Sequence, residues 1–97
     1  MDFPIGTPYN VAQYAMLLMM LAQVTGMEAH ELIITGGDCH IYFDQLLLVQ
    51  EQLNREPYKK PTLKLNPEIM DIDAFKLEDF ELCDYQHHTF IRYPVAT

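Results

Sequence analysis

The sequence predicts an α/β (α+β) fold in which a long buried helix packs on a mixed β-sheet. Three observations support this prediction: an apolar helical pattern from Val11 to about Thr25, short segments with strand composition after it, and a second helical pattern between those segments. Hydrophobic residues make up 49% of the 97 residues, which is typical of a globular chain that buries a core. This length allows at most one small domain.

Residues 2–9 are predicted to form a non-helical lead-in. Pro4 and Pro8 lack the amide hydrogen that a helix interior needs, and each pushes the residue before it towards an extended conformation. The helix should then begin after Asn10, whose side-chain oxygen suits an N-cap, and stop at Gly26.

The middle of this helix, residues 16–21, is apolar on every face. Such a helix is expected to be buried on most sides. A chain of 97 residues offers little material to surround it. We therefore expect that part of the surrounding protein is missing or that another chain covers the helix.

A strand is predicted at residues 32–34, which are apolar and mostly β-branched. The pair Gly36-Gly37 interrupts it, which indicates a bulge or a close backbone approach. Residues 40–42 would resume the strand and place His40 and Tyr42 on one face.

The densest cluster of side chains able to bind a ligand or take part in catalysis lies in this second half of the strand. Along a strand His40 and Tyr42 are about 7 Å apart, which suits two hydrogen bonds to one small polar ligand. A satisfied histidine and a packed tyrosine are the alternative explanation. Cys39 beside His40 suggests a thiolate–imidazole pair, but neighbours in a strand point to opposite faces, so we expect Cys39 to be a small buried hydrophobe.

The rest of the chain alternates between helical and extended patterns. We expect a helix from Asp44 to about Asn54, strands at residues 62–65 and 78–82 where apolar and polar residues alternate, a helical turn at 71–75, and a last strand at 90–93. There is no internal repeat or domain boundary, so residues 1–97 are expected to form one unit.

The charge balance excludes several classes of function. Fourteen acidic residues against six basic ones give a net charge of −8, which argues against binding to nucleic acid or to a membrane surface. The apolar run Tyr14–Ala22 is shorter than the roughly 20 residues that span a bilayer. Nothing at the N-terminus resembles a signal peptide, so we expect a cytoplasmic protein.

No metal site is expected. Cys39 and Cys83 form neither a disulfide framework nor a zinc pattern. The pair His87-His88 has no third ligand at a suitable spacing, so a solvated turn is the better interpretation. The glycine-rich phosphate-binding motifs are absent.

Several motifs agree in order with one family. Asp2-x-x-x-Gly6-x-Pro8-Tyr9-Asn10 before a long helix, Thr35-Gly36-Gly37-Asp38-x-His40-Ile41-Tyr42, Gln52-Leu53-x-Arg55-Glu56-Pro57, Phe75-x-x-Glu78-Asp79-Phe80 and the terminal Pro94-Val95-Ala96 resemble the corresponding segments of thymidylate synthases. The resemblance extends from Asp2 to Thr97 and implies that family's fold.

The resemblance also implies roles for individual residues. Binding of the nucleotide dUMP would involve Asp2, Asn10, His40, Ile41 and Tyr42, with Asn10 at the uracil edge and the histidine and tyrosine at the 3′-hydroxyl. The cofactor 5,10-methylenetetrahydrofolate would meet Asp2, Ile5, Gly6, Tyr9, Val95 and Ala96, the last two closing over it. From its residue type alone, Asn10 fits the uracil edge and an N-cap equally well.

The departures from the family pattern concern the reactive group. The family's nucleophilic cysteine and phosphate-binding arginines lie before the position matched by Asp2, and Cys39 stands where members commonly carry threonine. The resemblance therefore implies a C-terminal portion, inactive alone, that works with dUMP, folate and either a second copy or an N-terminal portion.

Two alternatives stay open. A hydroxymethylase of dUMP would use the same base contact at Asn10, and the departures from common bacterial synthases at Phe43-Asp44 and Ile91-Arg92-Tyr93-Pro94 favour it somewhat. A non-catalytic binding or dimer-forming module is the other. An asparagine rather than an aspartate at position 10 favours uracil over cytosine in every case.

Overall fold

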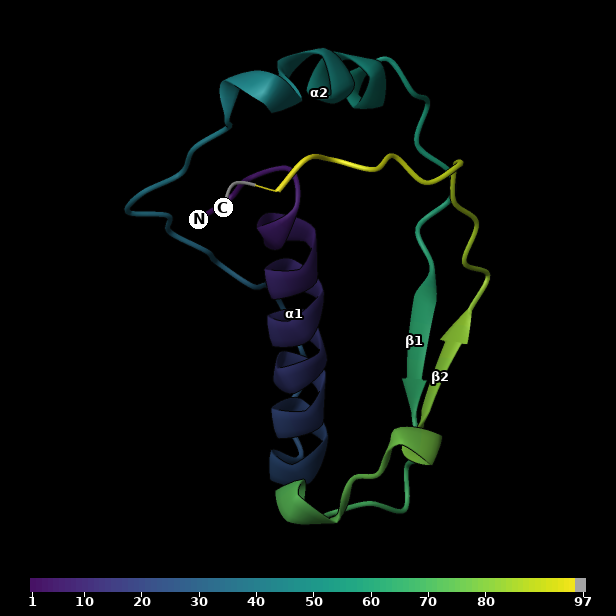
Figure 1. Cartoon of the computed structure of the whole chain (residues 1–97). Coiled ribbons are helices and arrows are strands. Elements are labelled where there is room, and N and C mark those ends of the chain that lie inside the picture. The colour runs from purple at the N-terminus through teal and green to yellow at the C-terminus, as the bar shows by residue number, and fades with distance from the viewer. Residues whose placement is uncertain (96–97) are drawn as a thin grey trace.

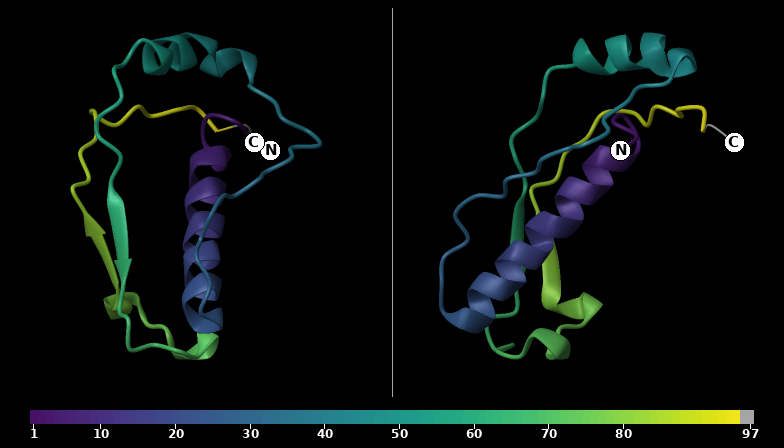
Figure 2. Two further views of the ribbon diagram at one scale, coloured as in Figure 1. Left: turned by 180° about the vertical axis from the view of Figure 1, so that it is seen from behind. Right: turned by 90° about the vertical axis from the view of Figure 1, so that its left-hand side faces the viewer.

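The structure is a computed structural model that describes residues 1–95, so the predicted cofactor contact of Ala96 lies outside the described residues. The elements form an open frame (Figure 1). Helix α1 (Gly6–Thr25) makes one side, and the hairpin of β1 (Thr62–Leu65) and β2 (Phe80–Cys83) makes the other. Helix α2 (Leu46–Leu53) crosses one end. Residues 26–42 return along α1 to reach α2 (Figure 2).

Helix α1 begins earlier than the sequence predicts. It starts at Gly6, so the predictions of a non-helical lead-in up to residue 9 and of an N-cap at Asn10 are wrong. The reason is that Pro8 lies in the first turn, where backbone amides have no acceptor within the helix. Proline lacks the amide hydrogen, and at this position its absence costs no helical hydrogen bond. The carbonyl oxygen of Asp2 accepts from the amides of Gly6 (2.8 Å) and Thr7 (3.1 Å).

The predicted end of α1 is confirmed. Gly26 has φ 71°, in the left-handed region that only glycine adopts without strain. Beyond it, the amide of Met27 donates to the carbonyl oxygen of Ala22 at 2.8 Å, which satisfies one of the free carbonyls of the last turn.

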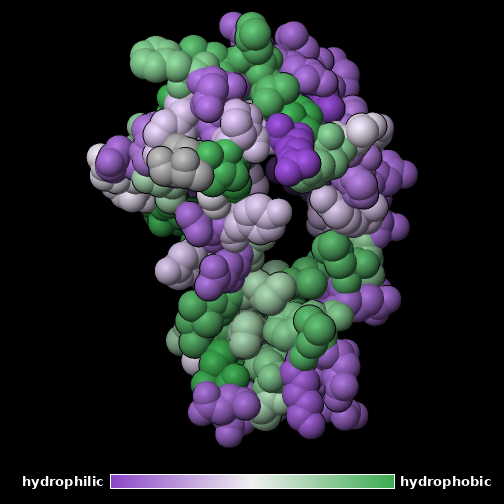
Figure 3. Space-filling view, viewed as in Figure 1, coloured by the Kyte–Doolittle hydropathy of each residue, from purple (hydrophilic) through white to green (hydrophobic). Residues whose placement is uncertain are grey.

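The predicted burial of α1 is not met within this chain. No residue of α1 is buried, and among residues 1–95 only Pro4 and Gln45 are. The accessible surface is 8133 Å², whereas a compact monomer of this mass exposes about 5,700 Å². The radius of gyration is 16.3 Å against an expected value of about 13 Å. The space-filling view shows hydrophobic side chains over α1 and the hairpin, and an opening between them (Figure 3).

The described residues form one sheet of two strands. β1 and β2 pair antiparallel, with Thr62 opposite Cys83 and Leu65 opposite Phe80. The strand predicted at 62–65 is confirmed, and that predicted at 78–82 is shifted to 80–83 because Leu77–Asp79 forms a 3₁₀ turn. Within residues 1–95 the only other pairing is an isolated parallel bridge between Asp2 and His40, which lies outside this antiparallel sheet.

Three predicted strand segments are not strands in this chain. Residues 32–34, 40–42 and 90–93 find no continuous partner among residues 1–95, and a strand is defined by such pairing. Gly36-Gly37 therefore forms no bulge, and Gly37 lies in a bend.

The remaining helical predictions are confirmed. A 3₁₀ turn, Phe43–Gln45, continues directly into α2, which together match the helix predicted from 44 to 54. The turn predicted at 71–75 appears as Ile72–Ala74. At that end of the frame, the side-chain amide of Gln23 donates to the carbonyl oxygens of Asn66 (2.8 Å) and Ile69 (2.7 Å), which ties α1 to the chain that follows β1. None of the helices described is long and apolar enough to cross a membrane.

Candidate functional site

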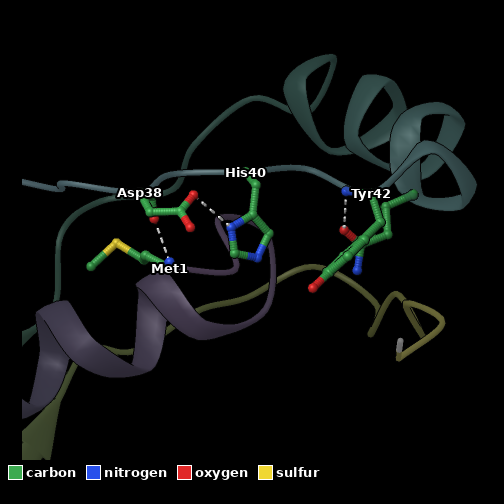
Figure 4. Close-up of polar contacts among 5 residues, drawn as sticks. Met1, Asp38, His40 and Tyr42 are labelled. Carbon is green, nitrogen blue, oxygen red and sulfur yellow. Dashed lines mark hydrogen bonds and ion pairs between the residues drawn. The ribbon is translucent and has the colours of Figure 1, made fainter. Parts of the chain in front are cut away.

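The site forms where the N-terminus meets the residues before α2. The amide of His40 donates to the carbonyl oxygen of Met1 (3.1 Å), and the amide of Phe3 donates to that of His40 (3.0 Å). The terminal amine of Met1 donates to the carbonyl oxygen of Asp38 (Figure 4). These bonds fix Asp2 beside His40.

His40 and Tyr42 lie together, as the sequence predicts. Their ring centroids are 5.0 Å apart at an angle of 72°, an edge-to-face contact. The Nδ1 atom of His40 faces a carboxylate oxygen of Asp38 at 3.3 Å. When Nδ1 carries the proton, Nε2 is left as an acceptor for a hydroxyl group. Ile41 lies between the two rings in sequence and is 40% exposed.

Asp2 and Asn10 flank Gly6. A Cβ atom placed on Gly6 would lie 3.8 Å from the Cβ of Asp2 and 3.9 Å from the Nδ2 of Asn10. Because Asn10 is inside α1, its side chain is free of any capping role. The sequence therefore brings the carboxylate and the amide to the same side of the helix start.

Two polar atoms at this helix start are buried without a partner. They are Oδ1 of Asp2 and the hydroxyl of Thr7. Buried oxygens in proteins are nearly always hydrogen-bonded, so such an atom indicates a place where another donor belongs. For Asp2, that donor can come from a ligand, a water molecule or further protein.

A cleft opens beside other residues of the start of α1. It has a volume of about 910 Å³ and lies between the start of α1, the end of α2 and residues 85–95. Three of the residues predicted to contact a cofactor, Ile5, Tyr9 and Val95, line it. Asp2 and Gly6, the other described residues predicted to contact a cofactor, do not line the cleft, and neither do Asn10, His40, Ile41 and Tyr42.

Sequence reasoning did not assign a role to most of the cleft's other lining. Arg55 donates to the carbonyl oxygen of Thr89 at 2.8 Å and lies 3.6 Å from the carboxylate of Glu51. His88 stacks on Tyr58 with ring centroids 4.5 Å apart. The only signal for this wall was the conspicuous Arg55-Glu56-Pro57 segment after α2.

The cysteines play no part in these contacts. Cys39 is exposed, so the prediction that it is a small buried hydrophobe is wrong. Its sulfur occupies the space that a Cβ atom on Gly36 would need. The Nδ1 of His40 faces Asp38 instead of the thiol. Within residues 1–95, no group of three or more potential ligand side chains is placed to hold a metal ion.

One residue that is bonded to the backbone of Tyr42, without lining the cleft, was missed altogether. The side chain of Gln45 is completely buried (0% exposed). Its Oε1 accepts from the amide of Tyr42 and its Nε2 donates to the carbonyl oxygen of Pro94, both at 3.1 Å. The sequence signal was a polar residue at the start of an otherwise apolar helix.

Two comparisons identify known proteins that this chain resembles. The family described as thymidylate synthase matches residues 1–97. The solved structure of thermostable thymidylate synthase A from Bacillus subtilis superposes with a TM-score of 0.93 over 97% of this chain, at 40% sequence identity. The chain covers 34% of that protein, so it spans about a third of its length. Since the family match covers the whole chain, this protein belongs to the thymidylate synthase family.

Proposed function

We propose that this chain is the C-terminal portion of a thymidylate synthase and supplies the part of its site that recognises the base and sugar of dUMP and lines part of the folate cleft. The reaction is the reductive methylation of dUMP to dTMP. The observation that carries the proposal is the bridge between Asp2 and His40, which joins two of the proposed nucleotide residues from distant segments of the chain.

The nucleotide contacts divide between two elements. Asn10, on α1, offers one donor and one acceptor to the O4 and N3–H edge of uracil. His40 and Tyr42 hold the 3′-hydroxyl, with the edge-to-face contact of their rings fixing their separation. Ile41 completes the same extended segment and contacts the nucleotide between them.

Two observations support folate binding in the cleft. Its volume of about 910 Å³ is large enough for a ligand of drug size, and its wall combines apolar and aromatic side chains with cations. Ile5, Tyr9 and Val95 form the apolar wall, and the missing Cβ of Gly6 leaves room beside Asp2. Methylenetetrahydrofolate, when bound, supplies the one-carbon unit and the hydride. The unpartnered Oδ1 of Asp2 accepts a hydrogen bond from a folate ring nitrogen or from a water molecule beside it.

The nucleophile comes from outside residues 1–97. Covalent catalysis on dUMP requires a thiolate that is activated by a neighbouring base or cation. The imidazole next to Cys39 in the sequence, that of His40, faces the carboxylate of Asp38 instead of the thiol, so it does not activate Cys39. The purified 97-residue chain is therefore expected to release no tritium from [5-³H]dUMP. Sustained release above a sample lacking the protein would refute this part of the proposal.

Base recognition gives the sharper test in the complete enzyme. Asn10→Asp replaces the amide donor by a carboxylate, which accepts from the amino group of cytosine and repels O4 of uracil. Calorimetry should show that the variant binds dUMP more weakly and dCMP more tightly than the unchanged enzyme does. An unchanged ratio of the two dissociation constants would remove Asn10 from the base site. Product analysis with folate and dUMP then separates thymine from hydroxymethyluracil.

A further inference from the structure

Residues 89–94 are hydrogen-bonded to residues 45–55, which include α2 and the turn that follows it. Three hydrogen bonds do this: Arg55 to the carbonyl oxygen of Thr89 (2.8 Å), the hydroxyl of Tyr93 to Oε1 of Gln52, and Gln45 to the carbonyl oxygen of Pro94 (3.1 Å). As the segment advances, its partners move backwards along the helix. The segment therefore runs antiparallel to α2, as Figure 1 also shows.

Gln45 differs from the other two anchors. The bonds made by Arg55 and Gln52 are exposed to solvent, whereas the side chain of Gln45 is 0% exposed. Both ends of its carboxamide are used, one on the amide of Tyr42 and the other on the carbonyl oxygen of Pro94. A buried amide that is bonded at both ends is a stiff link, because breaking either bond leaves an unsatisfied group away from water.

We propose that Gln45 is a positioning residue that makes the binding of nucleotide and of folate depend on each other. The inference rests on the proposed function, in which Tyr42 holds the deoxyribose and Val95, next to Pro94, lines the folate cleft. A nucleotide that holds Tyr42 also holds the carboxamide and, through it, Pro94. Folate then meets a cleft wall that has already been ordered, so its affinity rises. Linkage requires folate to strengthen nucleotide binding by the same factor.

The experiment uses the complete enzyme chain that contains residues 1–97. Calorimetry gives the dissociation constant of 5,8-dideazafolate, an unreactive folate analogue, without dUMP and with saturating dUMP. The ratio of the two constants is the coupling factor, expected to be at least about fivefold in the unchanged protein. Gln45→Met keeps the length of the side chain, loses both hydrogen bonds, and should lower the factor to below about twofold.

A second variant separates the two ends of the carboxamide. Gln45→Glu keeps an acceptor for the amide of Tyr42 but turns an oxygen towards the carbonyl oxygen of Pro94. It should leave the dUMP affinity nearly unchanged, weaken analogue binding, and lower the coupling factor as Gln45→Met does. Gln50→Met makes the same glutamine-to-methionine change at an exposed position of α2 and should keep the coupling factor of the unchanged protein.

The outcomes distinguish a failure of the proposed function from a failure of the role proposed for Gln45. Failure of the unchanged enzyme to bind dUMP refutes the proposed function itself. Binding of both ligands without coupling, or coupling that survives in Gln45→Met while only the melting temperature falls, leaves the function standing and overturns the role of Gln45. If Gln45→Met does not fold, the coupling factor of Gln45→Glu decides by the same threshold.

Discussion

Asp2 and His40 are neighbours in a parallel β-bridge, although one begins the chain and the other follows helix α1. Backbone bonds on both sides of the bridge, from His40 to Met1 and from Phe3 to His40, set this pairing. The site is therefore fixed by the backbone before any side chain acts. Side-chain substitutions at His40 and Tyr42 should consequently change ligand affinity without moving the segment.

The first prediction concerns the sugar contacts proposed for His40 and Tyr42. Tyr42→Phe removes one hydroxyl and keeps the ring beside His40, so it should weaken dUMP binding by about 0.5–1.5 kcal/mol, the worth of one hydrogen bond. The measurement is calorimetry on the complete enzyme with dUMP and with 2′,3′-dideoxyuridine monophosphate, which lacks the 3′-hydroxyl. The variant should bind the dideoxy nucleotide as the unchanged protein does. An equal loss for both nucleotides would place the hydroxyl of Tyr42 elsewhere.

Parts of the fold that depend on local chemistry could be predicted from the sequence. Gly26 ends α1 because the left-handed cap requires glycine, and residues 62–65 form a strand that pairs with a later segment of the same chain. Residues 32–34 and 90–93 have strand composition, yet composition does not supply a partner. The start of α1 was misjudged because proline breaks a helix only beyond its first turn.

The candidate site divides in the same way. His40 and Tyr42 were predicted from their spacing, and the structure places their rings in contact. Gln45 could not be predicted, because its burial depends on Pro94, which arrives from the far end of the chain. A glutamine in an isolated helical pattern is expected on the surface. Only the long-range fold turns it into a link.

The second prediction concerns the end of α1 where Gln23 is bonded to the chain that follows β1. Gln23→Leu removes the donor to the carbonyl oxygens of Asn66 and Ile69 and leaves both partly buried without it. The free energy of unfolding should fall by about 1–3 kcal/mol, measured by urea denaturation. Gln13→Leu is the matched control, since Gln13 is exposed on the same helix and should change stability by less than about 0.5 kcal/mol. Equal effects at the two positions would deny the role of these bonds.

The third prediction concerns Gly36. A Cβ atom there would overlap the sulfur of Cys39, whereas one on Gly37 meets nothing within 4 Å. Gly36→Ala should therefore destabilise the protein by at most about 1 kcal/mol, because the exposed thiol of Cys39 must leave its present rotamer for another. In a Cys39→Ala background the same substitution should cost almost nothing. Gly37→Ala serves as the control and should be neutral or slightly stabilising, because alanine restricts the unfolded chain.

The fourth prediction concerns acid stability near the hairpin. The hydrogen bond from Asn66 (3.0 Å), followed by that from the backbone amide of Lys76 (2.7 Å), lowers the pKa of Asp79 below its ordinary value of 3.8. A lowered folded pKa means that the ionised carboxylate contributes stability above pH 3.8, and that this contribution is lost as the pH falls through the folded value. Asp79→Asn should therefore be less stable than the unchanged protein at neutral pH, and the difference should shrink between about pH 5 and pH 2. Urea denaturation across that range checks it, with Asp73→Asn as the control at a nearby exposed acid. A stability difference that stays constant with pH would show that the carboxylate of Asp79 titrates alike in the folded and unfolded chains.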